Sequence, residues 1–275
     1  MNLLTDKLES TIQETILVPA LRGEYARAVS AISPVLDELH ANIPEKKRIS
    51  YGITHTVKVL AEHLHAHLAG EGAPVFEIAS KLYNHSKTHQ EAGVTLGILA
   101  EYGLSDYPPV LPFFERAAAS QDWILREFTQ MFFRRLIKKH PAEMQAFLLR
   151  LVKSEDPNLR RFVSETLRPV QENKWFCKEP DYSLTVLRHL FRESASYPRT
   201  SVGNNLSDLA RRLPELVYGL VEELVASGNK HSYWIAYRAC RNLVKKEPVR
   251  VMDLLGVDEY KYKKAVYQRG DYEAV

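Results

Sequence analysis

The sequence predicts an all-α protein, a helical solenoid built from two-helix repeats. Apolar residues recur at the spacing of helices along most of the chain, and similar segments recur at intervals of 35 to 39 residues. Hydrophobic residues make up 45% and charged residues 26% of the 275 residues, so the chain can bury an ordinary globular core. No run approaches the roughly 18 consecutive apolar residues of a membrane-spanning helix, so we expect no membrane partner.

The first 120 residues are predicted to form one helix after another. An apolar period of helical spacing runs through residues 18–40 and again through residues 53–68, with breaks at the segments IPEKK and GEGAP. We predict a single domain over residues 1–275. Within it we expect N-terminal helical repeats at 1–120, basic repeats that carry the site at 121–250, and a C-terminal tail at 251–275.

Four segments of the C-terminal half share one pattern of an apolar or aromatic start, basic residues, an apolar pair and a closing proline. They are residues 123–141, 158–169, 197–214 and 234–248. In register, one repeat position is polar throughout, with offsets of 35, 39 and 37 residues between Gln130, Glu165, Asn204 and Arg241. Such offsets are typical of HEAT-like repeats, whose second helices line a concave surface. We therefore expect a polar ladder along that surface.

Charge is distributed unevenly along the chain. Residues 123–250 contain 23 Lys and Arg against 14 Asp and Glu, a net charge of +9, whereas the rest of the chain carries −6. This split favours an electropositive face for a polyanion. The alternative is that solvated helix faces simply differ in charge.

All three tryptophans lie in the basic half, among the arginines. Trp123, Trp175 and Trp234 could therefore stack on bases while neighbouring cations hold phosphates. The alternative is packing in the core, which we favour for Trp123, because a large aromatic side chain in a helical repeat is more often buried.

The segment RRFVSETLRP places two arginines and a glutamate on one helix face. Arg161, Glu165 and Arg168 stand at positions i, i+4 and i+7, so the carboxylate lies between two guanidinium groups. The alternative is a solvated salt-bridge ladder of little energetic consequence. Glu165 also occupies the ladder position, and Trp175 follows on a short polar loop that could fold back over it.

No metal or cofactor is predicted. His85 and His89 are placed at i, i+4, and His63, His65 and His67 alternate, but neither set has the further ligands of a metal site. The chain lacks the glycine-rich nucleotide motifs and the GxSxG motif of hydrolases. Two cysteines, Cys177 and Cys240, are expected to be structural. The N-terminal segment MNLLTDKLESTIQE lacks the features of a secretory signal, which predicts a cytoplasmic protein.

Three stretches of the basic half carry a likeness to known proteins. They are DPNLRRFVSETLRP (156–169) followed by Trp175, SASYPRTSVGNNLSDLARRLPE (194–215) and, more loosely, TQMFFRRLIKKHP (129–141). In these stretches the chain resembles the HEAT-like-repeat DNA alkylation repair glycosylases of the AlkC/AlkD superfamily, and the AlkC branch most closely. The resemblance implies a right-handed solenoid whose concave arc binds DNA. It also implies a monomer that acts on the bacterial nucleoid and hydrolyses, without a cofactor, the N-glycosidic bond of cationic N-alkylated bases such as 3-methyladenine in duplex DNA.

The resemblance also implies roles for individual residues. Glu165 falls on the second substrate-facing glutamate of the family, and Trp175 falls on the tryptophan beside the site. Gln130 stands where the family has its first glutamate, with Glu127 about one turn earlier, and Thr166 stands where the family has glycine. The implied catalytic residues are Glu165 with Gln130 or Glu127. The DNA-binding residues that we predict are Trp123, Arg160, Arg161, Arg168, Trp175, Arg199, Asn204, Asn205, Trp234, Arg238 and Arg241.

Two other functions remain open. Glutamine at position 130 is compatible with a catalytically inactive relative that binds damaged or unusual DNA structures. Helical repeats also serve as protein-interaction scaffolds, because they offer extended surfaces.

Overall fold

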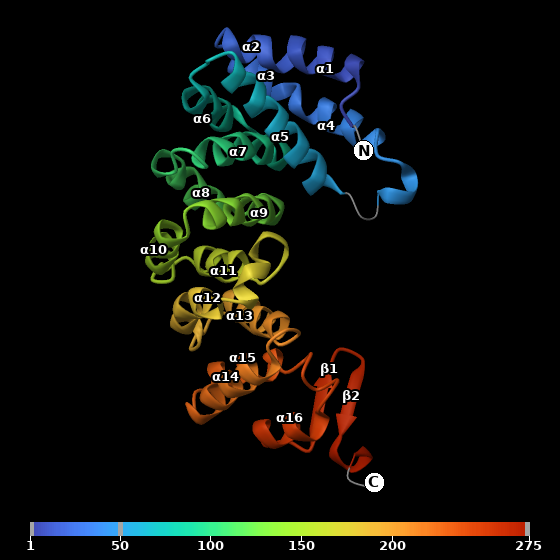
Figure 1. Cartoon of the computed structure of the whole chain (residues 1–275), viewed down its shortest axis with the longest axis vertical. Helices are drawn as coiled ribbons and strands as arrows, with labels where there is room; N and C mark the ends of the chain where they lie inside the picture. Colours follow the sequence, from blue (N-terminus) through green and yellow to red (C-terminus); the bar gives the residue numbers. More distant parts are fainter. Residues whose placement is uncertain (1–2, 49–51, 273–275) are drawn as a thin grey trace. The chain divides into compact units, whose positions relative to one another are not determined.

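The protein is a chain of successive helices with a β-hairpin near the C-terminal end (Figure 1). The computed structural model describes residues 3–48 and 52–272. The predicted all-α helical-repeat fold is confirmed. Over these described ranges, no helix combines the length and the apolar character needed to cross a membrane.

Contacts divide the chain into two compact units, unit 1 (Met1–His140) and unit 2 (Pro141–Val275). The predicted boundary between the N-terminal repeats and the basic repeats lies after residue 120, but the long helix that follows it, Trp123–Lys139, belongs to unit 1. The organisation as a single domain stays a prediction.

Unit 1 is a series of helices whose boundaries follow the predicted breaks at IPEKK and GEGAP. The apolar period of residues 18–40 is divided into three helices, because Gly23 adopts a left-handed conformation with φ of 78° and Ala31 forms a second break. The helices are α1 (Asp6–Ile12), α2 (Val18–Leu21), α3 (Tyr25–Ser30), α4 (Ile32–Ala41), α5 (Ile53–Gly70), α6 (Val75–His85), α7 (His89–Gly103), α8 (Leu111–Ala118) and α9 (Trp123–Lys139).

Helix α7 lies at the centre of unit 1, packed between α5 and α9. It starts with a capping box in which Thr88 and Glu91 bond each other's backbone N–H groups. Its glycines allow close packing. A Cβ atom at Gly97 would lie 2.5 Å from Cβ of Ala61 and 2.6 Å from Cζ of Phe132. Gly97 is therefore required by the approach of two neighbouring helices.

The substitution Gly97→Ala is expected to lower the free energy of unfolding by about 1–3 kcal/mol, because a methyl group overfills this contact. Gly219→Ala, in helix α14 (Pro214–Ala226) of unit 2, is the matched control. A Cβ atom at Gly219 would meet no side chain or neighbouring helix of the described residues within 4 Å. Alanine there should therefore stabilise α14 by up to about 1 kcal/mol. Thermal unfolding of both variants measures the contrast, and equal midpoints would contradict the packing argument.

Unit 2 has the same construction, with α11, α13 and α15 packed on one another in order. Five of its described helices begin with proline, which is favoured in the first turn because the missing N–H would have no partner there. Three of the four prolines that seemed to close repeats, Pro141, Pro214 and Pro248, therefore start the next helix, whereas Pro169 lies in the bend between α11 and the 3₁₀ segment at Gln171–Cys177. The elements are α10 (Pro141–Leu151), α11 (Pro157–Thr166), a 3₁₀ segment (Gln171–Cys177), α12 (Pro180–Leu187), α13 (Ser196–Leu209), α14 (Pro214–Ala226), α15 (Lys230–Ala239), α16 (Pro248–Leu255), β1 (Glu259–Tyr262) and β2 (Ala265–Gln268).

The expected C-terminal tail contains ordered structure that the sequence did not predict. Strands β1 and β2 pair antiparallel, with Glu259 opposite Gln268 and Tyr262 opposite Ala265. Tyr260 of β1 is fully buried. A four-residue strand is too short for its alternation to be recognised, so this hairpin depends on contacts with distant residues.

Candidate nucleic-acid interface

Three of the four helices that carry predicted site residues, α9, α11 and α15, start with a common capping arrangement. In each of three helices a cap side chain accepts a hydrogen bond from the first helical turn, and a serine two residues earlier accepts the N–H of the cap residue. The caps are Asp122, Asp156 and Asn229, and the serines are Ser120, Ser154 and Ser227.

These caps correct the predicted repeat register. Asp122 and Asp156 are 34 residues apart, whereas the predicted offset between Gln130 and Glu165 is 35. Gln130 is thus the eighth residue after its cap and Glu165 the ninth. One residue of an α-helix turns through about 100°. The two side chains therefore do not occupy equivalent positions in their helices, and placing them in one register was wrong by one residue.

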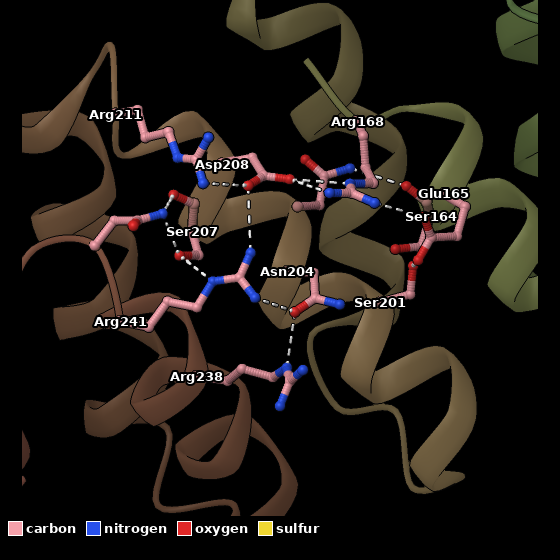
Figure 2. Close-up of polar contacts among 12 residues, drawn as sticks. Ser164, Glu165, Arg168, Ser201, Asn204, Ser207, Asp208, Arg211, Arg238 and Arg241 are labelled. Carbon is pink, nitrogen blue, oxygen red and sulfur yellow. Dashed lines mark hydrogen bonds and ion pairs between the residues drawn. The ribbon is translucent and has the colours of Figure 1, made fainter. Parts of the chain in front are cut away.

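The ladder is clearer within unit 2. Asn204 is the ninth residue after the cap of α13, as Glu165 is in α11, and the ninth residue after the cap of α15 is Arg238 rather than Arg241. Oδ1 of Asn204 accepts hydrogen bonds from Nε of Arg238 at 2.9 Å and from Nη1 of Arg241 at 2.8 Å. Arg238 and Arg241 therefore both belong to the polar ladder of unit 2 (Figure 2).

Glu165 is a buried carboxylate held on several sides. Its side chain is only 5% exposed. Ser201 of α13 donates a hydrogen bond to Oε1 at 2.7 Å, Nη1 of Arg168 donates to Oε2 at 3.2 Å, and Nη2 of Arg161 lies 3.5 Å from Oε1. The three charged groups meet as the sequence predicts, although Arg168 lies two residues beyond the end of α11 rather than on the helix face. Burial distinguishes the arrangement from a solvated salt-bridge ladder.

A second buried carboxylate, Asp208 of α13, joins arginines of the segments that directly follow α11, α13 and α15. Its Oδ2 accepts from Nε of Arg168 at 3.0 Å and from Nη2 at 2.5 Å, and its Oδ1 accepts from Nη2 of Arg241 at 3.2 Å. Arg211 lies 3.8 Å away (Figure 2). We call the group around these two carboxylates the arginine cluster, which comprises Arg161, Arg168, Arg211, Arg238 and Arg241 with Glu165 and Asp208.

The arginine cluster carries an excess of positive charge, with five guanidinium groups against two carboxylates. Burial by itself would lower the pKa of Arg168, but the charges of Glu165 and Asp208 raise that pKa overall. The guanidinium therefore stays protonated. A fixed, partly buried positive field of this kind favours the binding of a polyanion.

Aromatic rings lie against the arginines of unit 2. The guanidinium of Arg161 lies 4.4 Å from the ring centroid of Tyr197, and those of Arg199 and Arg238 lie 4.8 and 5.5 Å from the ring of Trp234. These cation–π contacts fix the orientation of the cations.

The other two tryptophans, Trp175 and Trp123, differ in how far their side chains are packed against other residues. Trp175 packs on Phe176 and Tyr182, with ring centroids 4.4 and 4.9 Å apart. Trp123 is 63% exposed, so our expectation that it packs in the core was wrong. It is the first residue of α9, immediately after the cap, where a side chain can point away from the neighbouring helices.

Arg160 is already engaged in an internal ion pair. Its Nε and Nη2 donate to the carboxylate of Glu193 at 2.6 and 3.1 Å, and its Nη1 donates to the carbonyls of Ser154 and Glu155. A phosphate contact by Arg160 would require part of this arrangement to open. Arg199 is partly engaged as well, since its Nη1 lies 2.7 Å from Nδ1 of His231.

The Arg160–Glu193 pair should make stability depend on pH. Burial would raise the pKa of Glu193, but hydrogen bonds from Arg160 and from the N–H groups of Ala195 and Ser194 lower it overall. The stabilisation is therefore present above the ordinary glutamate pKa of about 4.3 and is lost as the pH falls through the lower pKa of the folded state. The free energies of unfolding of wild type and Glu193→Gln, measured in urea, should differ most near neutral pH. A difference that stays constant into the acid range would contradict this.

In α9 of unit 1, Gln130 is buried and its Nε2 donates to Oε2 of Glu127. Its Oε1 is buried and has no hydrogen-bond partner among the described residues. The amide thus holds the neighbouring glutamate in place and leaves one acceptor unused.

Several other candidates have local structural roles. Asn205 is buried and donates from Nδ2 to the carbonyl of Ser164 at 2.9 Å, which links α13 to α11.

His85 and His89 do not share a helix face, because the chain breaks between α6 and α7. Nδ1 of His89 lies 2.9 Å from Oδ2 of Asp122 instead. The described ranges contain no group of three or more His, Cys, Asp or Glu side chains placed to hold a metal ion. Burial raises the pKa of Cys240 to about 12.

Ser201 and Asp208 were not among the site residues predicted from the sequence. With Asn204 or Asn205 they stand at i, i+3 or i+4, and i+7 within SVGNNLSD, which is one face of α13. The same pattern that selected the face of α11 would have found them.

The fold and the arginine cluster define a class of helical-repeat protein with a basic face, and comparisons show which proteins it resembles. No family model matches the chain. A stretch of 122 residues, 42% of the chain, is 29% identical to the uncharacterized protein YhaZ of Bacillus subtilis (strain 168) and spans 33% of that protein.

Solved structures cover more of the chain. Alkylpurine DNA glycosylase AlkC of Pseudomonas fluorescens, bound to DNA containing an abasic site analog, matches 90% of this chain and 69% of its own, with a TM-score of 0.61 at 21% identity. AlkD2 of Streptococcus mutans matches 80% of this chain and 98% of its own, with a TM-score of 0.59 at 19% identity. A third match is smu.31 of Streptococcus mutans UA159, which covers 69% and 98%, with a TM-score of 0.52 at 19% identity. The chain has the helical-repeat fold of these structures.

Proposed function

We propose that the protein belongs to the AlkC/AlkD superfamily and is a monomeric DNA glycosylase. It would hydrolyse the N-glycosidic bond of cationic N-alkylated bases, such as 3-methyladenine, in duplex DNA. The observation that carries this proposal is a buried carboxylate, Glu165, fixed within a cluster that has an excess of guanidinium groups. The likeness to AlkC, a DNA glycosylase, supports it.

The chemistry suits one fixed carboxylate. An alkylated ring nitrogen gives the base a positive charge, so the base leaves as a neutral molecule when the bonding electrons move to it. The sugar develops positive charge at C1′ until water adds there and loses a proton. Preorganised negative charge close to the sugar stabilises this transition state. Because the side chain of Glu165 is only 5% exposed, while Arg161 is 16% and Arg168 30% exposed, contact with the sugar requires one arginine to turn toward DNA.

The rest of the proposed interface would bind the DNA backbone. Arginines on α11, α13 and α15 present charge to phosphates, which is independent of sequence and sensitive to salt. The partly exposed rings of Trp175 and Trp234, and the exposed ring of Trp123 in unit 1, would provide surfaces on which bases stack. The residues proposed for this role are Trp123, Arg160, Arg161, Arg168, Trp175, Arg199, Asn204, Trp234, Arg238 and Arg241. Asn205 would act indirectly, by linking α13 to α11 through its hydrogen bond to the carbonyl of Ser164.

The second candidate function is DNA binding without catalysis. It is favoured by Gln130, whose neutral amide cannot supply the negative charge of a carboxylate. In the catalytic proposal Gln130 assists by holding Glu127. A protein-interaction scaffold is the remaining alternative, and it predicts no affinity for DNA.

The test is release of free base from duplex DNA treated with a methylating agent, together with binding to the same DNA at two salt concentrations. Release supports the glycosylase. Salt-sensitive binding without release supports the non-catalytic relative. Absence of both binding and release would exclude these two functions and favour the scaffold.

A further inference from the structure

The C-terminal hairpin is fastened to the helix that carries Arg238 and packs beside Arg241 of the arginine cluster. Tyr260 of β1 stacks on Tyr237 of α15 with ring centroids 4.4 Å apart, and its hydroxyl donates to the carbonyl of Tyr237 at 2.8 Å. The hydroxyl of Tyr237 accepts from the N–H of Lys261 at 2.7 Å and donates to its carbonyl at 3.1 Å. These contacts fix the hairpin in position relative to α15.

The hairpin also meets the arginines directly. Nη1 of Arg241 donates to the hydroxyl of Tyr262 at 3.3 Å. The guanidinium groups of Arg238 and Arg241 both lie 5.9 Å from the centroid of the Tyr262 ring, and Nζ of Lys263 lies 5.8 Å from it. Burial would raise the pKa of Tyr262, but the hydrogen bond from Arg241 and the three positive charges lower it overall. Tyr262 thus lies in a positive field.

Two lysines at the tip of the hairpin extend this field into solvent. Lys263 and Lys264 form the turn between β1 and β2, and both are exposed. Lys261, by contrast, is paired with Glu259 at 2.7 Å. Lys263 has φ of 55°, a left-handed conformation in which glycine or asparagine is usual at a hairpin turn. The turn therefore keeps a cationic side chain at a position where the backbone favours another residue.

We propose that the tip of the hairpin, Lys263 and Lys264 with Tyr262 and Arg238, is a binding site for phosphates of the DNA backbone. The inference rests on the proposed function, because it takes DNA as the partner. It extends the interface beyond the helical repeats to residues 262–264, in a segment where no site was expected. The hydroxyl of Tyr262, the guanidinium of Arg238 and the two ammonium groups supply the hydrogen-bond donors that phosphate oxygens accept.

The test measures the affinity of the full chain for a duplex oligonucleotide by fluorescence anisotropy over a range of salt concentrations. The double variant Lys263→Asn/Lys264→Gln removes both charges and places asparagine at the left-handed position, so the turn is preserved. The slope of log affinity against log salt is expected to become shallower by about 2, because each phosphate contact contributes about 0.9.

The matched control is Lys46→Gln/Lys47→Gln. These two exposed lysines also adjoin each other in a short turn, so the control makes the same change in net charge. Its salt slope should equal that of wild type. If wild type binds and the two double variants behave alike, the hairpin site is wrong while DNA binding stands. If wild type does not bind duplex DNA, the proposed function fails and the hairpin site fails with it.

Discussion

Replacing Glu165 by glutamine is expected to slow the release of alkylated base by about 100-fold or more, the loss typical when a preorganised charge is removed from a transition state. Glutamine has nearly the same size, and its oxygen can still accept the hydrogen bond that Ser201 donates to Glu165 at 2.7 Å. The substitution therefore removes charge while preserving most of the shape. Single-turnover release of base from methylated duplex DNA measures the effect.

The measurement needs a control for loss of stability, since Glu165 also balances the charges of Arg161 and Arg168. Glu101→Gln is a suitable control, because Nη2 of Arg135 donates to Glu101 at 3.0 Å in another largely buried ion pair, within unit 1. It makes the same chemical change at a residue that is not part of the arginine cluster. Both variants should be assayed below their unfolding midpoints.

The outcome distinguishes a catalytic role from a structural one. If Glu165→Gln binds methylated DNA but does not release base, while Glu101→Gln releases it at the wild-type rate, the carboxylate of Glu165 is catalytic. If both variants lose activity in proportion to their stability, Glu165 only holds α11 to α13. Unchanged release by Glu165→Gln would exclude the proposed role altogether.

Short-range features of this site could be predicted from the sequence. Arg161 and Glu165 lie one turn apart on α11 and Arg168 follows two residues after its end, so their spacing in the sequence is enough to bring the three side chains together. Prolines also marked helix boundaries, although Pro141, Pro214 and Pro248 begin helices rather than end repeats. Both inferences depend only on residues near one another in the chain.

Features that depend on distant residues could not be predicted in the same way. Asp208 receives hydrogen bonds from Arg168 and Arg241, which are 40 and 33 residues away in sequence. Glu193 lies 33 residues from its partner Arg160. Which cations remain available to a ligand thus depends on pairings between helices, and the composition of a single segment does not reveal them. The hairpin was missed for the same reason, because its order comes from packing on Tyr237.

The substitution Asp208→Asn is expected to separate stability from DNA binding. Asp208 is the shared acceptor for Arg168 and Arg241, whose side chains are 30% and 16% exposed. Removing its charge deprives two partly buried guanidinium groups of a counterion, which typically costs about 3 kcal/mol of unfolding free energy. The same change adds one unit of positive charge to the proposed interface, so affinity for duplex DNA at low salt should be unchanged or higher. Urea unfolding measures the change in stability, and fluorescence anisotropy measures the affinity of the same variant for duplex DNA.

The exposed ion pair between Arg188 and Glu223 provides the comparison that makes this prediction specific. Oε2 of Glu223 accepts from Nη1 of Arg188 at 2.6 Å, but both side chains are nearly half exposed. Glu223→Gln should therefore cost less than about 1 kcal/mol, although it changes the net charge by the same amount. A loss of stability confined to Asp208→Asn would follow from burial of the cluster. A fall in DNA affinity in the folded Asp208→Asn protein would mean that the arrangement of the arginines, rather than their total charge, determines binding, and the simple electrostatic account of the interface would be wrong.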